Sequence, residues 1–210
     1  MKASPHALLI GNGPEISPAL LRRLARKTDF IVAADGGANA ALQAGIIPHV
    51  IIGDLDSVSA TTRRKLAASE WVFVDNQHNT DLQKALDFLL ARGYNTCTLA
   101  GFTGGRVDFT LGNALALGSY GKKMDLCLAG DGWMLFPVGS RRTFTAHVGA
   151  RVSLVPLTRC RGVTLTGLKF PLKNACLPIG TTRTLSNQTS QPYFTVSLTH
   201  GTLLVYVETK

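Results

Sequence analysis

The stretch FIVAADGGANAALQAGIIPHVIIGDLDS, residues 30–57, decides the fold of this chain. Residues 30–34 and 50–52 are short, apolar and rich in β-branched side chains, which predicts strands that are buried on both faces. Between them, residues 38–44 are mostly alanine with leucine and glutamine, which favour a helix. A strand, a helix and a second strand in this order predict a parallel β-α-β unit.

The same alternation extends over the first two thirds of the chain. Further strands are expected at residues 6–10, 71–74, 96–100 and 125–129. Further helices are expected at residues 18–28, 60–69, 81–92 and 111–120. Strands that alternate with helices predict an α/β fold, here an α/β/α domain with a mainly parallel sheet.

Beyond residue 140 the pattern changes to short strands with no long helix between them. These strands are expected at residues 142–145, 151–156, 162–166, 194–198 and 203–207, with a polar loop at 186–191. The alternation at residues 195–199, followed by the turn signal His200-Gly201, is typical of antiparallel hairpins. We therefore predict an α/β domain over residues 1–138 and an all-β sandwich over residues 139–210.

Composition describes an ordinary globular protein that folds without a partner. Of the 210 residues 45% are hydrophobic and 17% are charged, which excludes a disordered or fibrous chain. The net charge of +9 would suit nucleic acid, an anionic membrane or a small anion. Basic residues do not interleave with aromatic ones, and no apolar run reaches the roughly 20 residues of a membrane helix. We expect neither a nucleic-acid nor a membrane partner.

The four cysteines form no metal-binding or disulfide pattern. Cys97, Cys127, Cys160 and Cys176 show no CxxC pairing and no histidines at zinc-ligand spacing. Residues 1–10 lack the charged and then apolar order of a secretory leader. These features predict reduced thiols in a cytoplasmic protein.

Acidic side chains follow the expected strands at one end. Asp35 follows residues 30–34, Asp54 and Asp56 follow residues 50–52, and Asp81 opens an expected helix. Because the carboxyl ends of parallel strands meet at one edge of a sheet, these carboxylates should lie together and hold Mg²⁺. For Asp81 a structural alternative is that Asn79 or Thr80 caps the helix and the carboxylate complements the helix dipole.

Two glycine-containing loops are candidates for phosphate binding. Gly11-Asn12-Gly13-Pro14 follows the first strand and brings backbone N–H groups close to an anion, although a plain tight turn explains it equally well. In Gly104-Gly105-Arg106 the glycines permit close approach, and the guanidinium can form paired hydrogen bonds to phosphate. Asp108 lies beside that anion site, which implies a cation or a substrate amine as its partner.

Together, and in this order, the motifs resemble the thiamin pyrophosphokinase family over nearly the whole chain. They are Ala34-Asp35-Gly36-Gly37, Gly53-Asp54-Leu55-Asp56-Ser57, Thr80-Asp81 with Lys84-Ala85-Leu86, Gly104-Gly105-Arg106-Val107-Asp108 with Asn113, Thr166-Gly167-Leu168-Lys169-Phe170, and Ser186-Asn187. The resemblance implies an ATP-binding α/β domain and a thiamin-binding β-sandwich. It also implies a homodimer with shared sites, and transfer of a pyrophosphoryl group from ATP to thiamin that releases AMP.

The resemblance also assigns roles to residues. Mg²⁺ would be held by Asp35, Asp54, Asp56 and Asp81, and the catalytic set would be Asp54, Asp56, Asp81, Arg106 and Asp108. ATP would contact Asn12, Gly36, Gly37, Thr80, Gly104, Gly105 and Arg106. Thiamin would contact Asp108, Phe170, Ser186 and Asn187.

Three positions depart from the family pattern and keep alternatives open. Phe170 stands where tryptophan is common, Phe109 replaces a polar residue, and the segment around His78 lacks acids often found there. Plain core packing is an alternative for both phenylalanines. The departures leave two other functions open, a different heteroaromatic alcohol as acceptor or a catalytically degenerate nucleotide-binding module.

Overall fold

A computed structural model describes residues 5–76 and 78–209 of the chain, and the sequence predictions for residues 1–4, 77 and 210 lie outside it. The chain forms two compact units. The first runs to Ala116 and adds Lys123–Asp131, and the second comprises Leu117–Lys122 and the chain from Gly132 onward. We keep the division after residue 138 as a proposal for the two functional domains.

The first unit is built on a parallel sheet, as the sequence predicts. Its strands are β1 (His6–Ile10), β2 (Phe30–Ala34), β3 (Val50–Gly53), β4 (Glu70–Phe73), β5 (Thr96–Ala100) and β6 (Asp125–Gly130). They are ordered β6-β5-β1-β2-β3-β4, and every pairing is parallel. The chain reverses direction along the sheet between β4 and β5, so the carboxyl ends of β1, β2, β3 and β5 frame one crevice.

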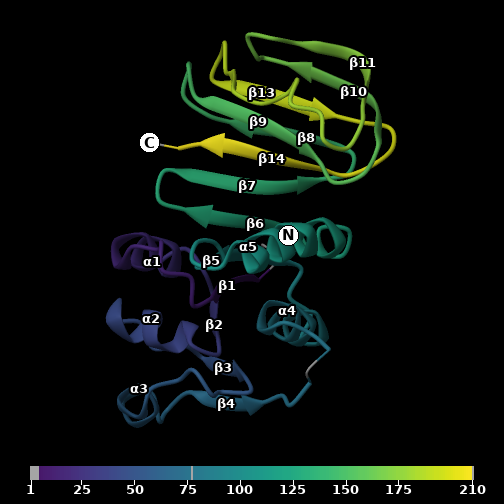
Figure 1. The fold of residues 1–210 in the computed structure, drawn as a ribbon. Helices are drawn as coiled ribbons and strands as arrows, with labels where there is room; N and C mark the ends of the chain where they lie inside the picture. Colours follow the sequence, from purple (N-terminus) through teal and green to yellow (C-terminus); the bar gives the residue numbers. More distant parts are fainter. Residues whose placement is uncertain (1–4, 77, 210) are drawn as a thin grey trace. The chain divides into compact units, whose positions relative to one another are not determined.

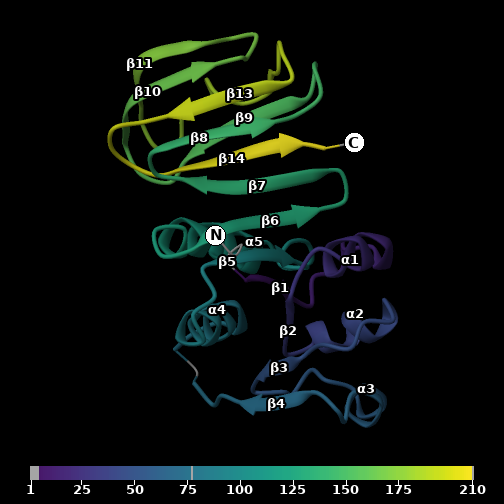
Figure 2. The same ribbon diagram turned by 180° about the vertical axis from the view of Figure 1, so that it is seen from behind.

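Helices follow the strands of the first unit. They are α1 (Pro18–Ala25), α2 (Gly37–Gln43), α3 (Ala60–Lys65), α4 (Asp81–Ala91) and α5 (Val107–Tyr120). Figures 1 and 2 show α1, α2 and α3 along one face of the sheet and α4 along the other. Leu21 and Ala41 pack on Leu8 and Ile10 of β1, which buries the apolar face of these helices. This packing confirms the α/β/α layers.

Helix α5 begins four residues earlier than the predicted start at residue 111. Gly104 and Gly105 both have positive φ, at 83° and 64°, and Arg106 follows them directly. The turn therefore ends at Arg106 and the helix starts at Val107. As a result Asp108 lies in the first helical turn and not in a loop.

The second unit is a sandwich of two antiparallel sheets. The first sheet has the order β12 (Asn187–Gln188), β9 (Arg151–Pro156), β14 (Leu203–Glu208) and β7 (Trp133–Val138). The second has the order β11 (Leu172–Leu177), β10 (Cys160–Thr166), β13 (Tyr193–Ser197) and β8 (Arg141–Thr145). Both sheets contribute to one core, where Leu154 and Val205 of the first meet Val163 and Phe194 of the second. The predicted sandwich is confirmed.

Three strands of this sandwich were not predicted. Strand β7 is hard to predict from the sequence because it contains Pro137, and proline is disfavoured within a sheet. Asn174 interrupts β11 with a positive φ of 49°, which breaks the alternation that identifies a strand. The loop predicted at residues 186–191 is wrong at Asn187 and Gln188, which pair with β9 as β12. Local sequence does not encode this pairing.

In the described part of the chain, every helix is too short or too polar to cross a membrane.

Phe194 should be the main packing residue of the sandwich. Its side chain is fully buried and stacks on Phe144 with ring centroids 4.9 Å apart. Because truncation leaves a cavity between the sheets, we expect Phe194→Ala to lower the free energy of unfolding by about 3–5 kcal/mol. Urea unfolding, followed by Trp133 fluorescence in a Trp71→Phe background, measures this change. The control Phe170→Ala removes an exposed ring and should cost less than about 0.5 kcal/mol, so equal losses would contradict the prediction.

Candidate active site

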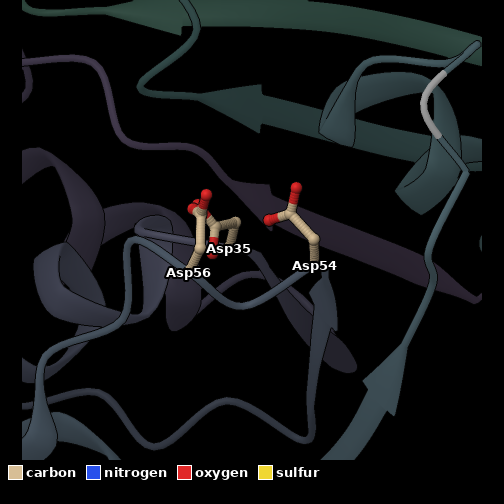
Figure 3. A group of neighbouring side chains, drawn as sticks. All are labelled: Asp35, Asp54 and Asp56. Atoms are coloured by element: carbon tan, nitrogen blue, oxygen red, sulfur yellow. The ribbon is translucent and has the colours of Figure 1, made fainter.

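Three carboxylates meet at the carboxyl ends of β2 and β3. Asp35 directly follows β2, while Asp54 and Asp56 follow β3. One oxygen atom of each lies within 4.8 Å of the others, and Figure 3 shows the three side chains converging. Asp35 is buried, Asp54 is half-buried and Asp56 is exposed, so the cluster opens from the sheet toward solvent. The sequence predicted this meeting from strand order alone.

Unusual backbone geometry brings these side chains together. Asp35 and Leu55 have positive φ, at 43° and 65°, which is uncommon for residues with a side chain. Gly53 has φ of 147°, and a Cβ atom there would lie 3.0 Å from Cβ of Asp35 and 3.3 Å from Oδ1 of Asp81. Glycine is therefore needed at position 53 because two acidic side chains occupy the space beside it.

A polar network fixes the loop that carries Asp54 and Asp56. The Asn39 amide donates to the Ser57 carbonyl at 2.9 Å, and its Oδ1 accepts from Ser59 N and Thr62 Oγ1. Arg63 donates to the carbonyl of Leu55. Neither Asn39 nor Arg63 was predicted from the sequence, although an asparagine two residues after the Asp35-Gly36-Gly37 motif was a usable signal.

The cluster contains one buried acceptor that has no donor. Oδ1 of Asp54 is buried and has no hydrogen-bond partner among the described residues. Asp35 and Asp56 do have donors, because Ser57 N donates to Asp35 at 3.3 Å and Ser57 Oγ donates to Asp56 at 2.9 Å. An unsatisfied buried carboxylate oxygen costs free energy, and a cation bound here would remove that cost. Three hard oxygen donors of this kind fit Mg²⁺.

Asp81 lies beside the cluster and pairs with a buried lysine. Lys84 Nζ lies 3.0 Å from Asp81 Oδ1, and only 5% of the Lys84 side chain is exposed. Burial raises the pKa of Asp81 above its usual value, the Lys84 ammonium opposes this shift, and the charges of Asp35 and Asp54 add to it. Thr80 caps α4 in a capping box with Gln83, so the capping role considered for Thr80 is confirmed.

A cavity of about 440 Å³ lies next to the acids and is lined by main chain from the glycine loops. Asn12, Gly104, Gly105 and Arg106 line it, together with Asp35 and Asp81. A Cβ atom on Gly11 would lie 2.5 Å from the Gly101 carbonyl, and one on Gly13 would lie 2.4 Å from the Thr103 carbonyl. The two loops therefore pack so closely that only glycine fits, which leaves bare main chain at the cavity wall.

Gly36 and Gly37 pack against the main chain of β1 and the side chain of Asn12, next to the cavity. A Cβ atom on Gly37 would lie 2.1 Å from the Ile10 carbonyl, and one on Gly36 would lie 2.4 Å from the Asn12 amide. Both positions therefore let α2 approach β1 and the first loop. Asn113 supports the other side of the cavity, where its amide donates to the Phe102 carbonyl at 2.9 Å.

Arg106, Asp108 and Phe109 form an exposed group at the start of α5. Arg106 donates from Nε and Nη2 to the two oxygens of Asp108, at 3.1 and 2.5 Å. The hydrogen bonds from Arg106 lower the pKa of Asp108 below its usual value. The guanidinium also lies over the Phe109 ring, 4.4 Å from its centroid. The core-packing alternative for Phe109 is wrong, because 47% of this residue is exposed and its ring supports Arg106.

In the second unit, Asn187 is bonded to the main chain of Phe170. Its Oδ1 accepts from Phe170 N at 3.0 Å, and its Nδ2 donates to Phe170 O at 2.8 Å. Asn187 is buried, whereas 61% of Phe170 is exposed, so the core-packing alternative for Phe170 is also wrong. Ser186 has φ of 57° and donates from its N–H to Ser153 Oγ at 2.9 Å. These contacts hold an exposed aromatic ring on a fixed backbone.

Comparison with known proteins gives one family for both units. The family description "Thiamin pyrophosphokinase, catalytic domain" matches residues 21–128, and "Thiamin pyrophosphokinase, vitamin B1 binding domain" matches residues 143–203. A thiamine pyrophosphokinase of Bacillus subtilis is 32% identical over 181 residues, which cover 83% of this chain and 85% of that protein.

Solved structures agree with this result. The crystal structure of thiamine pyrophosphokinase from Bacillus subtilis has a TM-score of 0.86 at 28% identity, and covers 98% of this chain and 99% of its own. That of thiamin pyrophosphokinase from Geobacillus thermodenitrificans has a TM-score of 0.85 at 26% identity, with 98% of each chain covered.

Lys84 should control the ionisation of Asp81. In Lys84→Met the ammonium that lowers the pKa of Asp81 is lost, while burial and the charges of Asp35 and Asp54 remain. We therefore expect the pKa of Asp81 to rise further, measured by ¹³C NMR titration of its carboxyl group without divalent metal. Lys65→Met, which removes an exposed lysine from α3, is the control and should leave that pKa unchanged. An unchanged pKa in Lys84→Met would contradict the prediction.

Proposed function

The chain belongs to the thiamin pyrophosphokinase family, and on that premise we propose that its acid-rich cavity transfers the pyrophosphoryl group of ATP to thiamin. The hydroxyethyl oxygen of thiamin attacks the β-phosphorus of ATP and forms a new P–O bond. The bond between the β-phosphorus and the oxygen that bridges to the α-phosphorus breaks, and AMP leaves. The hydroxyl proton is lost, and thiamin diphosphate is the second product.

Asp35, Asp54 and Asp56 would hold Mg²⁺, with Asp81 at the edge of its water shell. The orphaned Oδ1 of Asp54 and the closeness of the three carboxylates support this assignment. When bound, the ion neutralises phosphate charge and fixes the polyphosphate for in-line displacement. The ammonium of Lys84 neutralises the carboxylate of Asp81. This fourth acid can therefore lie beside the site without a second metal ion.

The glycine loops and Arg106 bind the phosphates of ATP in this proposal. The main chain of Gly104 and Gly105 lines the cavity, and no side chain obstructs an approaching phosphate there. Arg106 carries a planar guanidinium suited to paired hydrogen bonds with phosphate oxygens. In the free protein Arg106 is held by Asp108 and Phe109. When ATP binds, some of its hydrogen bonds to Asp108 are replaced by hydrogen bonds to phosphate oxygens.

Asp108 is the proposed acceptor of the alcohol proton. Its lowered pKa makes it a weak base at neutral pH. A weak base suffices when the transition state is loose, because the alcohol proton leaves late and positioning supplies most of the rate. Asp108 also orients Arg106, so one carboxylate serves both the phosphate and the acceptor alcohol.

The β unit supplies the thiamin contacts. Phe170 offers an exposed ring on which a cationic heteroaromatic ring can stack. Asn187 is better assigned as a positioning residue for Phe170 than as a direct ligand, because its amide is already bonded to that main chain. Ser186 precedes it with its hydroxyl side chain exposed. Matches to both family domains disfavour the degenerate module and the different acceptor.

Purified protein with ATP, Mg²⁺ and thiamin should form AMP and thiamin diphosphate in equal amounts. Without thiamin no AMP should appear, and both products are measured by chromatography. Asp54→Asn should lower turnover by about two orders of magnitude or more, because it removes charge from the cation site. Its unfolding midpoint should stay equal or rise, since carboxylate repulsion is relieved. ATP binding without either product would contradict the proposed reaction.

A homodimer through α5 is part of the same proposal. Val107, Leu111 and Leu115 are four residues apart along this helix, and between 59% and 72% of each is exposed. Residues at this spacing share one helix face, so they present an apolar stripe to solvent. Asp108 and Phe109 lie on the same helix, which would bring the partner subunit close to the active site.

Leu111→Glu with Leu115→Glu should therefore convert the dimer to a monomer. Burying two carboxylates in an apolar interface costs free energy, so two copies of the double variant should not associate at micromolar concentration. Light scattering after size exclusion measures the mass. The charge-matched control Thr61→Glu with Lys65→Gln, on exposed positions of α3, should remain dimeric. A monomeric wild-type chain would overturn the proposal directly.

We also propose that the protein resides in the cytoplasm. All four cysteines are free thiols, and two of them, Cys97 and Cys160, are buried. Buried free thiols persist most readily in a reducing compartment.

A further inference from the structure

The net positive charge of this protein is concentrated in its β unit. Residues 132–210 contain nine of the 22 lysine and arginine residues but only one of the 13 acidic residues. That acid, Glu208, already accepts a hydrogen bond from the main chain of Arg151. Nearly all of the net charge of +9 therefore lies in this unit, where a field of one sign attracts anions.

A hollow of about 400 Å³ in the second unit gathers part of this charge. It is lined by Arg159 and Arg161, at the start of β10, and by Thr199 and His200 in the turn between β13 and β14 (Figure 1). Arg159 and Arg161 flank Cys160, which is buried. Arg159 and Arg161 are both exposed and both line the hollow, whereas the residue between them is buried.

The frame of this hollow is tightly packed. Arg161 N donates to His200 O, and Thr199 N donates to Arg161 O, both at 3.0 Å. A Cβ atom on Gly162 would lie 2.4 Å from Thr199 Oγ1, and one on Gly201 would lie 2.7 Å from Cys160 Sγ. Positive φ at both glycines, 67° and 103°, further restricts these positions to glycine. The two segments thus form a preformed cradle.

The two guanidinium groups and the imidazole ring of this cradle have no protein partner among the residues that the structure describes. Within residues 5–76 and 78–209, Arg159 and Arg161 form no ion pair, and the His200 ring forms no hydrogen bond. Thr199 is different, because its hydroxyl donates to Arg161 O at 3.1 Å and serves the frame. Two guanidinium groups in a hollow match the oxygens of a phosphate group.

We propose that the hollow formed by Arg159, Arg161 and His200 is a second anion site, which binds inorganic phosphate or the phosphate group of a small molecule. A tetrahedral dianion accepts paired hydrogen bonds from both guanidinium groups and one from the His200 ring. The site lies wholly in the β unit and uses none of the residues assigned to the transfer reaction, so it stands or falls independently of the proposed function.

Residue-resolved NMR tests this site. Inorganic phosphate is titrated into ¹⁵N-labelled protein without divalent metal, with sodium chloride at equal ionic strength as the reference. We expect saturable amide shifts at Arg161, Gly162, His200 and Gly201 in the millimolar range. Arg159→Ala with Arg161→Ala should weaken this binding at least about tenfold, because both charged donors are lost.

A matched control variant distinguishes phosphate binding at this hollow from general attraction to the positive charge of the unit. Lys173→Ala with Arg183→Ala removes two exposed cations of the same unit outside the hollow, and should leave the phosphate affinity within about twofold. Equal weakening by both double variants, or shifts that do not saturate, would overturn the proposal. Parallel titrations with pyrophosphate and AMP identify which phosphate source binds most tightly. A short RNA that saturates these amides when none of the three small anions does would also overturn it.

Discussion

The repulsion among carboxylates at one edge of the parallel sheet is the constraint on which the rest of the active unit depends. The ends of β2 and β3 bring Asp35, Asp54 and Asp56 within ligand distance of one another, and Asp81 adjoins them. At such distances like charges repel one another, so cations close to the carboxylates would stabilise the arrangement. One is built in as Lys84, and the other would come with the nucleotide.

The surrounding structure resists relaxation of this cluster. The loop after β3 is held by Asn39 and Arg63, so the acids cannot move apart without breaking hydrogen bonds to main chain. Gly53 leaves room for two of them, and the glycines of the neighbouring loops bring main chain against main chain. In the proposed function this rigidity means that the site is preorganised for a cation and phosphates before they bind. Preorganisation of this kind is how electrostatic catalysis avoids reorganisation during the reaction.

The two units differ in their balance of acidic and basic residues. Residues 1–131 contain 12 of the 13 acidic residues, and in the proposed function some of these acids would hold a metal ion. Residues 132–210 contain one acidic residue and a surplus of arginine. The exposed ring of Phe170 belongs to this second unit, and so do Arg159 and Arg161, which form no ion pair with any residue that the structure describes. Under the two proposals its surface would accept ligands of two kinds, a heteroaromatic ring and an anion.

The sequence by itself determined the layered α/β unit, the sandwich and the meeting of Asp35, Asp54 and Asp56. These features follow from periodicity and strand order, because buried strands are apolar on both faces and parallel strands end at one edge. The motifs, taken in order, also indicated the family.

Only the tertiary structure decided the partners of individual side chains. Asp81 pairs with Lys84, Arg106 is held by Asp108 over Phe109, and Asn187 supports Phe170 across 17 residues of sequence. Local propensity likewise missed β7 and β12, since Pro137 disfavours a strand and the Asn187 pairing is set by β9. Such contacts join segments that are distant in sequence, so their geometry depends on packing that periodicity does not encode.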